Sequence, residues 1–557
     1  MSIWRKIFQA LSSRERLAVN ALVLVVLLSL AVTVVGFYYH LTREIPIPGG
    51  QYTEGVVGQP IYVNPVLSVG NDADADLSSL VYSSLMKYDA DGKLAPDLAE
   101  SYEISKDKLT YTVHLKKDVK WQDGEKFSAD DVLFTIQTIQ DPAYKSPLRQ
   151  SWQGVGVEVV DDNTLHFLLQ SPYAFFVNNL TVGIIPRHIW ESVAPSNFLL
   201  ADYNLRPVGT GPYKFSDFQK DADGNILSYS LVTSPEYYGA KPFIANLNFS
   251  FYFDEEGLLG AYNNKQIFGM SYISPSKIAD IKNTRSTNIF SINIPRYFAV
   301  FFNQQKNKAL ADKEVRKALS LATDRQAIIK DVLAGRGKQI FSPIPPGSFG
   351  ATDDVKKFDF NLDQANKTLD DDGWKRGGDG FRGKNGQPLE FSLVTTDWPD
   401  LAATADLLKK QWEAIGAKVD VQSLPVADVQ QNFIRPREYD ALLFGQVLGI
   451  DPDPYAFWHS SQTRDPGLNL ALYSNPDVDK LLEKIRQESD DSARVDEFKK
   501  LQQQVADDVP ALFLYAPDYL YVVNKTVRGI SIHSMVTPDE RFANVSEWYV
   551  KTKRVKK

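Results

Sequence analysis

The sequence predicts a mixed α/β protein of two or three lobes, preceded by one long apolar helix. The chain has 557 residues, and single hydrophobic cores usually stop growing near about 250–300 residues, so several lobes are expected. Strand, helix and strand patterns follow one another at residues 389–395, 400–415 and 418–422, which is the βαβ order of a parallel sheet. An apolar run at residues 17–41 exceeds the roughly 20 residues that a helix needs to cross a bilayer.

The N-terminal segment is predicted to be an uncleaved membrane anchor. Four basic residues precede the apolar run, so the positive-inside rule keeps residues 1–16 in the cytoplasm and the body outside the cell membrane. These residues are Arg5, Lys6, Arg14 and Arg16. A cleaved signal peptide is the alternative, with Ser29-Leu30-Ala31 as a small-residue cleavage site. The apolar run continues well past that site, which favours an anchor at 17–41 followed by a Pro/Gly linker at 42–51.

Charge and composition exclude several classes of function. The chain carries a net charge of −8, and because its first 50 residues are net basic, the body is more acidic still. An acidic body argues against nucleic acid as a partner, since phosphate contacts need a basic surface. The absence of cysteine excludes disulfides, thiolate metal sites, a cysteine nucleophile and lipid attachment through an N-terminal cysteine.

The body is predicted to consist of strands and helices in the following order. Residues 59–67 have strand character, and acidic residues introduce a helix at 77–87. Residues 102–115 alternate as a hairpin, and Ser128 caps a helix at 129–140. A run of strand formers at 289–303 precedes a helix at 313–334, which Asp312 caps and Gly335 ends. The other expected elements are strands at 155–160, 164–169, 511–515 and 519–524 and two amphipathic helices within 477–509.

The stretch EYDALLFGQVLGIDPDPYAFW, residues 438–458, carries the candidate ligand site. Residues 439–447 are an apolar run rich in strand formers, typical of a strand buried on both faces. The run breaks at Gly449, and two carboxylates and three aromatic residues follow: Asp451, Asp453, Tyr455, Phe457 and Trp458. Ligands of open α/β sheets bind beyond the carboxyl ends of strands, so these side chains are candidates for the floor of a cleft. The alternative is a Pro-rich surface turn whose aromatic residues fill the core.

No signature of an enzyme is present. The sequence contains no GxSxG, HExxH, Walker loop or Rossmann fingerprint, and no two of its six histidines are four residues apart. Pairs of carboxylates are common, but no feature distinguishes a catalytic pair from solvated surface residues. We therefore predict no catalytic residue, no metal and no cofactor.

Five stretches, in this order along the chain, together carry a specific pattern: LVYSSLMKYDADGKLAPDLAESYEIS, TYTVHLKKDVKWQDGEKFSADDVLFTI, PVGTGPYKF, FFNQQKNKALADKEVRKALSLATDRQAII and LYSNPDVDKLLEK. The pattern resembles family 5 of the extracellular solute-binding proteins of ABC importers, the dipeptide- and oligopeptide-binding class. The resemblance covers most of residues 52–549.

The resemblance implies a two-lobed clamshell, of the type II periplasmic-binding-protein kind, that closes on its ligand. Lobe I would comprise residues 52–75, 206–300 and 515–549, the extra subdomain of lobe I residues 76–205, and lobe II residues 301–514. The chain would cross the hinge between the lobes near 296–303 and again near 513–521. We keep these three names for these residue ranges.

The resemblance also implies a difference in ligand recognition. Peptide-specific members hold the α-amino group of the ligand with an aspartate three residues before an acidic-Pro pair. Ungapped alignment places Leu448 or Ile450 at that position, whereas a gapped alignment gives the role to Asp451. An amine in a closed, water-poor cleft needs a carboxylate partner, so peptides with a free N-terminus are doubtful under the ungapped alignments. The family also binds sugars, metal chelates and other solutes; scarce histidine disfavours nickel.

The leading hypothesis is a membrane-anchored, monomeric receptor that captures a peptide or peptide-like solute and delivers it to the permease subunits of an ABC importer. An extended ligand would pair with the backbone of Phe444, Gly445 and Gln446 as an added strand. Tyr297, Trp398, Tyr455 and Trp458 would supply apolar walls, or else pack in the core, and Asp451 would supply a charge. The alternative is a solute-binding sensor or scaffold that acts on a membrane partner without transport. An extracellular hydrolase would need a nucleophile–base pair, for which the sequence offers no candidate.

Overall fold

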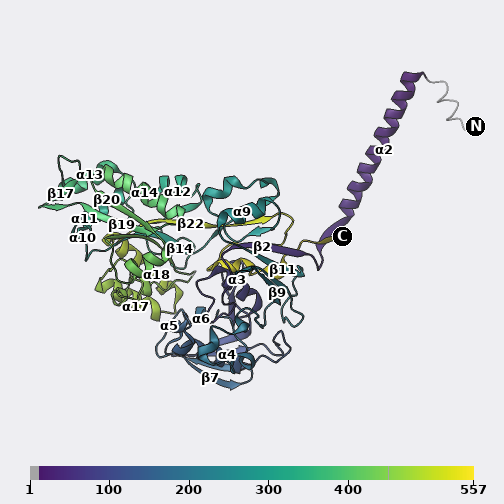
Figure 1. Cartoon of the computed structure of the whole chain (residues 1–557), viewed down its shortest axis with the longest axis horizontal. Helices are drawn as coiled ribbons and strands as arrows, with labels where there is room; N and C mark the ends of the chain where they lie inside the picture. Colours follow the sequence, from purple (N-terminus) through teal and green to yellow (C-terminus); the bar gives the residue numbers. More distant parts are fainter. Residues whose placement is uncertain (1–11, 450) are drawn as a thin grey trace, which may run out of the picture.

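The protein is described here by a computed structural model that covers residues 12–449 and 451–557; Arg5 and Lys6 lie outside the described residues. Helix α2 (Ser13–Leu41) projects away from the body, and none of its residues is buried (Figure 1). It begins at a capping box, in which the Ser12 side chain accepts a hydrogen bond from the Glu15 N–H and the Glu15 carboxylate accepts one from the Ser12 N–H. Helix α2 is long and apolar enough to cross a membrane, a property that it shares with signal sequences.

A twelve-stranded mixed sheet runs through the body. Its lobe I part contains β2 (Gln51–Val57), β9 (Tyr213–Lys220), β10 (Ile226–Thr233), β11 (Asn246–Tyr252), β12 (Gly269–Met270) and β13 (Thr287–Asn293). Its lobe II part contains β15 (Gly337–Gln339), β19 (Glu390–Thr396), β20 (Lys418–Leu424) and β21 (Ala441–Val447). Strand β14 (Arg296–Phe302) lies in this part of the sheet, although its residues 296–300 fall in the range predicted for lobe I. The long strand β22 (Ala511–Asn524) spans both parts and crosses the whole body in Figure 1.

The chain passes between the two parts of the sheet in two places. Strand β22 pairs with β14 through residues 511–515 and with β13 through residues 518–524, so one continuous strand replaces the two predicted ones. Strands β13 and β14 are separated by Ile294 and Pro295, so the predicted single run at 289–303 is divided there. The crossing along β22 is continuous paired strand, whereas the crossing at Ile294 and Pro295 is a short segment between β13 and β14 that belongs to neither strand.

Lobe II is a sheet covered by helices on both faces. Successive residues of β14 alternate between two cores: Val300 and Phe302 lie in one, Ala299 and Phe301 in the other. Helices α14 (Pro399–Ala414) and α12 (Arg325–Asp331) lie above the sheet in Figure 1, and α17 (Pro476–Gln487) and α18 (Asp491–Asp508) lie below it. Strand β21 is likewise buried on both faces, as its apolar sequence predicted.

The predicted βαβ unit is confirmed as β19, α14 and β20, with β19 and β20 parallel. The single helix predicted at 313–334 is wrong: the structure has α11 (Lys313–Leu321) and α12, because Asp324 caps a second helix through the Ala327 N–H. Asp312 caps α11 as expected.

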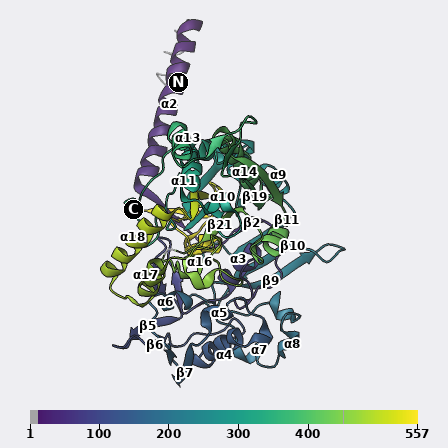
Figure 2. The ribbon, with the colours of Figure 1, turned by 90° about the vertical axis from the view of Figure 1, so that its left-hand side faces the viewer.

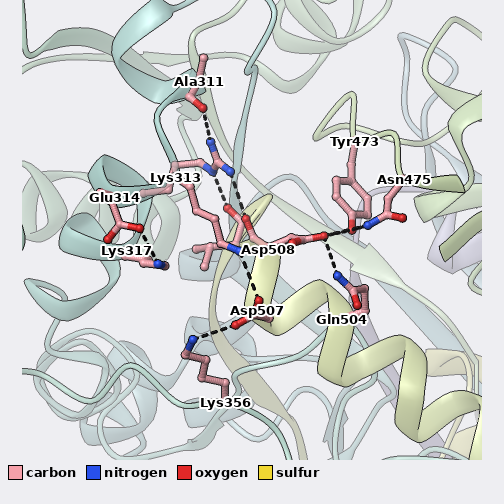
Figure 3. A network of polar contacts seen from close by, with 12 residues as sticks. Ala311, Lys313, Glu314, Lys317, Lys356, Tyr473, Asn475, Gln504, Asp507 and Asp508 are labelled. Carbon is pink, nitrogen blue, oxygen red and sulfur yellow. Dashed lines mark hydrogen bonds and ion pairs between the residues drawn. The ribbon is translucent and has the colours of Figure 1, made fainter. Parts of the chain in front are cut away.

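The C-terminal end of α18 is fixed to α11 by a polar network (Figure 3). The buried guanidinium of Arg316 donates to the carbonyl oxygens of Asp508 and Val509 at 3.0 and 2.8 Å, which satisfies acceptors that a helix end leaves free. The Asp508 carboxylate accepts from the Tyr473 hydroxyl and, at 3.0 Å, from the Asn475 amide. This network holds α18 in place, and the opposite end of that helix faces the seam between lobe II and the extra subdomain.

Lobe I and the extra subdomain share one hydrophobic core. The extra subdomain carries a four-stranded antiparallel sheet, in the order β5 (Ala99–Ile104), β6 (Thr110–Leu115), β8 (Thr164–Leu168) and β7 (Gly156–Asp161), and helix α4 (Ala129–Gln140), at the bottom of Figures 1 and 2. Helix α3 (Asp72–Val81) begins where the Asn71 side chain accepts from two backbone N–H groups. Fully buried Arg541 forms ion pairs with Glu54 and Asp76 and ties α3 to the C-terminal part of the chain.

Candidate ligand cleft between the lobes

Strand β21 has one edge that is only partly paired. On one side it pairs with β14 along its full length, from Ala441 opposite Phe302 to Val447 opposite Arg296. On the other side the described residues show ladder pairs with β19 at Ala441 and Leu442 alone. Beyond Leu443, that edge has no ladder partner among the described residues and could accept a further strand.

The hydrogen bonds around β21 show which backbone groups point to the open edge. The Leu448 N–H donates to the Pro295 oxygen at 2.9 Å, on the β14 side, and strand alternation places the backbone groups of Gln446 and Phe444 on that same side. The backbone groups of Gly445 and Val447 therefore face the open edge. The Leu443 carbonyl, which shares this direction, accepts from the Thr395 hydroxyl at 3.0 Å. Gly445 and Val447 thus offer the donors and acceptors that an added strand needs.

The turn after β21 lies in the seam between lobe II and the extra subdomain. Gly449 adopts a φ of +91°, which favours glycine and ends the strand; Ile450 lies outside the described residues. The Asp451 carboxylate pairs with the Arg494 guanidinium of α18 at 3.3 Å. Its backbone oxygen accepts from the Asn178 amide of the extra subdomain at 3.5 Å. Burial raises the pKa of Asp451 to about 6, although Arg494 acts in the opposite direction.

Asp453 is bound from both sides of the same seam. Arg486 of α17 pairs with its carboxylate at 2.7 Å, and the Tyr173 hydroxyl of the extra subdomain donates to it at 3.1 Å. The Arg486 guanidinium also stacks on the Tyr455 ring, 3.8 Å from its centroid. Asp453 therefore serves as a bridge between the extra subdomain and lobe II.

The predicted apolar walls lie in different environments. The side chains of Tyr297 and Trp458 are 0% and 1% exposed and belong to a lobe II core, where the Tyr297 hydroxyl donates to the Gln446 side chain. Tyr455 lies between Arg486 and the His459 ring. Trp398 is 58% exposed at the start of α14. The structure thus joins Tyr297 to the β21 site residues and leaves Trp398 at the surface.

A cavity of about 470 Å³ lies between lobe I and the extra subdomain, next to this seam. Tyr88 and Asn178 both line it, and the Tyr88 hydroxyl donates to the Asn178 side chain at 3.2 Å. Since Asn178 also contacts Asp451, the cavity borders the turn after β21. Burial, together with neighbouring Asp539, raises the pKa of the Glu540 carboxyl at its wall to about 8.

Sequence reasoning missed the partners that fix this turn: Tyr173, Asn178, Arg486 and Arg494. The two arginines lie on amphipathic helices among many other charged residues, so no local pattern separates them. The Val447 backbone groups point to the open edge because of the hydrogen-bonding register between β21 and β14, which a sequence does not specify.

Comparison with known proteins identifies the family. The model for bacterial extracellular solute-binding proteins, family 5, matches residues 93–467, more than half of the chain. This chain belongs to that family. Its members are solute-binding proteins and not enzymes, and the mixed α/β fold is the periplasmic-binding-protein fold that the sequence predicted.

Several relatives of this family 5 protein match it over nearly their whole length. It is 28% identical to the oligopeptide-binding protein AppA of Bacillus subtilis over 91% of this chain and 92% of AppA. It is 27% identical to the dipeptide-binding protein of Escherichia coli over 88% and 93% of the two chains. The solved structure of AppA with a nonapeptide matches with a TM-score of 0.75 and 28% identity, over 91% of this chain and 100% of AppA. The solved structure of NikZ from Campylobacter jejuni, in complex with Ni(L-His), matches with a TM-score of 0.76 and 28% identity, over 90% of this chain and 100% of NikZ.

Proposed function

We propose that this protein is a membrane-anchored extracytoplasmic receptor that binds a peptide or peptide-like solute as an extended strand and delivers it to the permease of an ABC importer. The observation that carries the proposal is the open edge of β21, where the backbone groups of Gly445 and Val447 have no ladder partner among the described residues, next to the seam between lobe II and the extra subdomain. An extended peptide backbone is the ligand that such an edge recognises. The relatives described as oligopeptide- and dipeptide-binding proteins support the same class of solute.

The charge at the site supports a ligand whose cationic group approaches Asp451. Leu448 is partly buried against a lobe II core, so an amine there would lack a carboxylate. Asp451 carries a carboxylate at the seam, but it already pairs with Arg494. A ligand amine would share Asp451 with that guanidinium, which predicts weaker amine recognition than a dedicated aspartate gives.

Replacement of Val447 by proline tests the added strand. The substitution removes one N–H that faces the open edge and leaves the ladder with β14 intact, since the backbone groups of Val447 point away from β14. We expect binding to a peptide ligand to weaken about 2- to 12-fold, the equivalent of about 0.5–1.5 kcal/mol for one hydrogen bond. Native mass spectrometry of the purified chain first identifies the co-purified solute, and calorimetric titration with that solute measures the effect.

Two further variants serve as controls. Val447→Ala keeps the N–H, and its affinity should stay close to that of the parent protein. Leu448→Pro removes the N–H that donates to Pro295, and it should lower the melting temperature of the ligand-free protein. Unchanged affinity in Val447→Pro would contradict binding along this edge, and a co-purified solute without an extended backbone would contradict the peptide class.

A further inference from the structure

The C-terminal end of the chain forms a small sheet at the base of the apolar helix. Strand β23 (Thr552–Lys556) pairs antiparallel with β1 (Thr42–Pro46), which directly follows α2. The ladder extends by one bond at each end, from the Lys557 N–H to the Leu41 oxygen at 2.9 Å and from the Ile47 N–H to the Lys551 oxygen at 3.1 Å. The segment that composition predicted to be a linker is therefore partly a paired strand.

This small sheet is also joined to the last turn of α2. The Arg554 guanidinium donates to the backbone oxygens of Tyr39 and Thr42 at 3.3 and 3.0 Å. It lies over the Tyr39 ring, 4.3 Å from the centroid. The direction of α2 relative to the body is thus set by specific contacts, and in Figure 1 the C-terminus lies at the base of α2.

One face of the β1–β23 sheet is basic and apolar. Residues directly opposite each other in an antiparallel pair share a face, so Arg43 lies beside Val555 and Ile45 beside Lys553. Lys557 extends this face next to Leu41. No carboxylate lies on it; Glu44 points to the other face, where it pairs with Arg554. The side chains of Arg43, Lys553 and Lys557 are exposed, and among the described residues none of the three forms an ion pair. We call Arg43, Ile45, Lys553, Val555 and Lys557 the juxtamembrane face.

We propose that the juxtamembrane face binds the phosphate headgroups of anionic lipids at the outer surface of the membrane and so fixes the orientation of the body. The inference rests on the proposed membrane anchor. A strand rises about 3.3 Å per residue, so Arg43 and Ile45 lie roughly 3 and 10 Å beyond Thr42. The headgroup layer is about 5–7 Å thick, and Arg and Lys side chains are long enough to reach it from this distance.

The distribution of charge supports a lipid surface as the partner. Basic and apolar side chains together on one face are typical of segments that lie at a membrane interface. The exposed aromatic residues Phe37, Tyr38 and Tyr39 form the end of α2, where an interfacial belt is expected. The whole chain is acidic, with a net charge of −8, so an anionic surface repels the rest of the body and attracts this end.

The test uses the full chain in lipid nanodiscs made of phosphatidylcholine alone or with about one-third phosphatidylglycerol. Because the chain has no cysteine, Thr552→Cys gives a single labelling site on the opposite face of the same sheet. Quenching of a fluorophore there by headgroup-attached nitroxide lipid reports how closely the sheet approaches the membrane. We expect quenching at least twice as strong in the anionic discs, and we expect salt to reduce that difference.

The triple variant Arg43→Gln, Lys553→Gln and Lys557→Gln should lose the dependence on anionic lipid. The matched control is the triple variant Lys106→Gln, Lys117→Gln and Lys120→Gln, which removes the same charge from exposed positions of the extra subdomain. This control should keep the dependence on anionic lipid. Two outcomes would overturn the headgroup contact and leave the anchor unaffected. One is equal quenching in both kinds of disc, and the other is an equal loss of the dependence on anionic lipid in both triple variants. A chain that fails to co-elute with any nanodisc overturns the anchor and the contact together.

Discussion

Among the proposed site residues, Asp451 is the acidic one, and its surroundings raise its pKa. Burial raises its pKa to about 6 from an ordinary value of 3.8, so the folded protein binds a proton there more tightly than the unfolded chain does. This group therefore makes the ligand-free protein more stable as pH falls from about 6 toward 4. Pairing with a cationic ligand group has the opposite requirement, because it needs the ionised carboxylate.

We expect ligand affinity to fall as pH decreases below about 6, by up to about tenfold per pH unit, if a cationic group of the ligand pairs with Asp451. The variant Asp451→Asn should bind weakly at every pH between 5 and 7.5 and should lack this dependence. Calorimetric titration across that range measures both effects. The control is Asp491→Asn, which removes the other carboxylate beside Arg494 at a well-exposed position and should keep the pH dependence. If ligand affinity in Asp451→Asn depended on pH as it does in the parent protein, the titrating group would be another residue.

At the scale of one segment, two adjacent phenylalanines of the extra subdomain lie in two different hydrophobic cores. Phe176 lies in the core that lobe I shares with the extra subdomain, whereas Phe175 is 2% exposed in a lobe II core and lies under the Arg494 guanidinium. The Ala174 N–H donates to the Arg486 oxygen at 2.8 Å in the same seam. Both views place this segment, at the start of α6 (Phe176–Asn179), beside α17 (Figures 1 and 2).

Replacement of Phe175 by alanine should open the seam. Burying a phenylalanine contributes roughly 1.5–3 kcal/mol, and this contribution exists only while the extra subdomain and lobe II are in contact. We therefore expect a larger radius of gyration by small-angle scattering and faster ligand release. Phe176→Ala is the matched control: it should lower the melting temperature with little change in the separation of the lobes. Equal radii of gyration for the parent protein and Phe175→Ala would contradict a seam that holds the lobes together.

For the whole molecule, two segments connect the two parts of the large sheet, and a small sheet connects the body to α2. Strand β22 and the β13–β14 segment are these two connections, so we expect closure of the proposed clamshell to bend the chain near residues 294–296 and 516–518. At the far end, the β1–β23 pairing leaves little free chain between α2 and β2. With α2 as the proposed anchor, we expect the body to stay close to the membrane around that helix.

We expect the full-length chain to remain in the membrane fraction after an alkaline carbonate wash and to be released by detergent. An apolar helix of 29 residues spans about 43 Å, enough to cross a bilayer with some tilt. Intact mass measurement of the detergent-released protein should include the N-terminal segment. A shorter soluble form that starts after Ala31 would contradict the anchor.

The sequence alone determined the features that depend on local pattern. The apolar run of α2, the βαβ unit around α14 and the strand before Gly449 each follow from periodicity, and each lies where it was expected. The order of the five quoted stretches predicted the family, which the family model confirms. Local patterns predicted these features because the hydrophobic period and helix caps act over only a few residues.

Only the tertiary structure decided what surrounds the site. The open edge at Gly445 and Val447 exists because the ladder between β19 and β21 ends at Leu442. Asp453 is a bridge because Tyr173 and Arg486 approach it from segments far apart in the chain. Tyr297 and Trp458 could have been walls or core by sequence, and packing places both in the core. The physical reason is that ladder register, ion pairing and burial are properties of distant segments brought together, which no local pattern specifies.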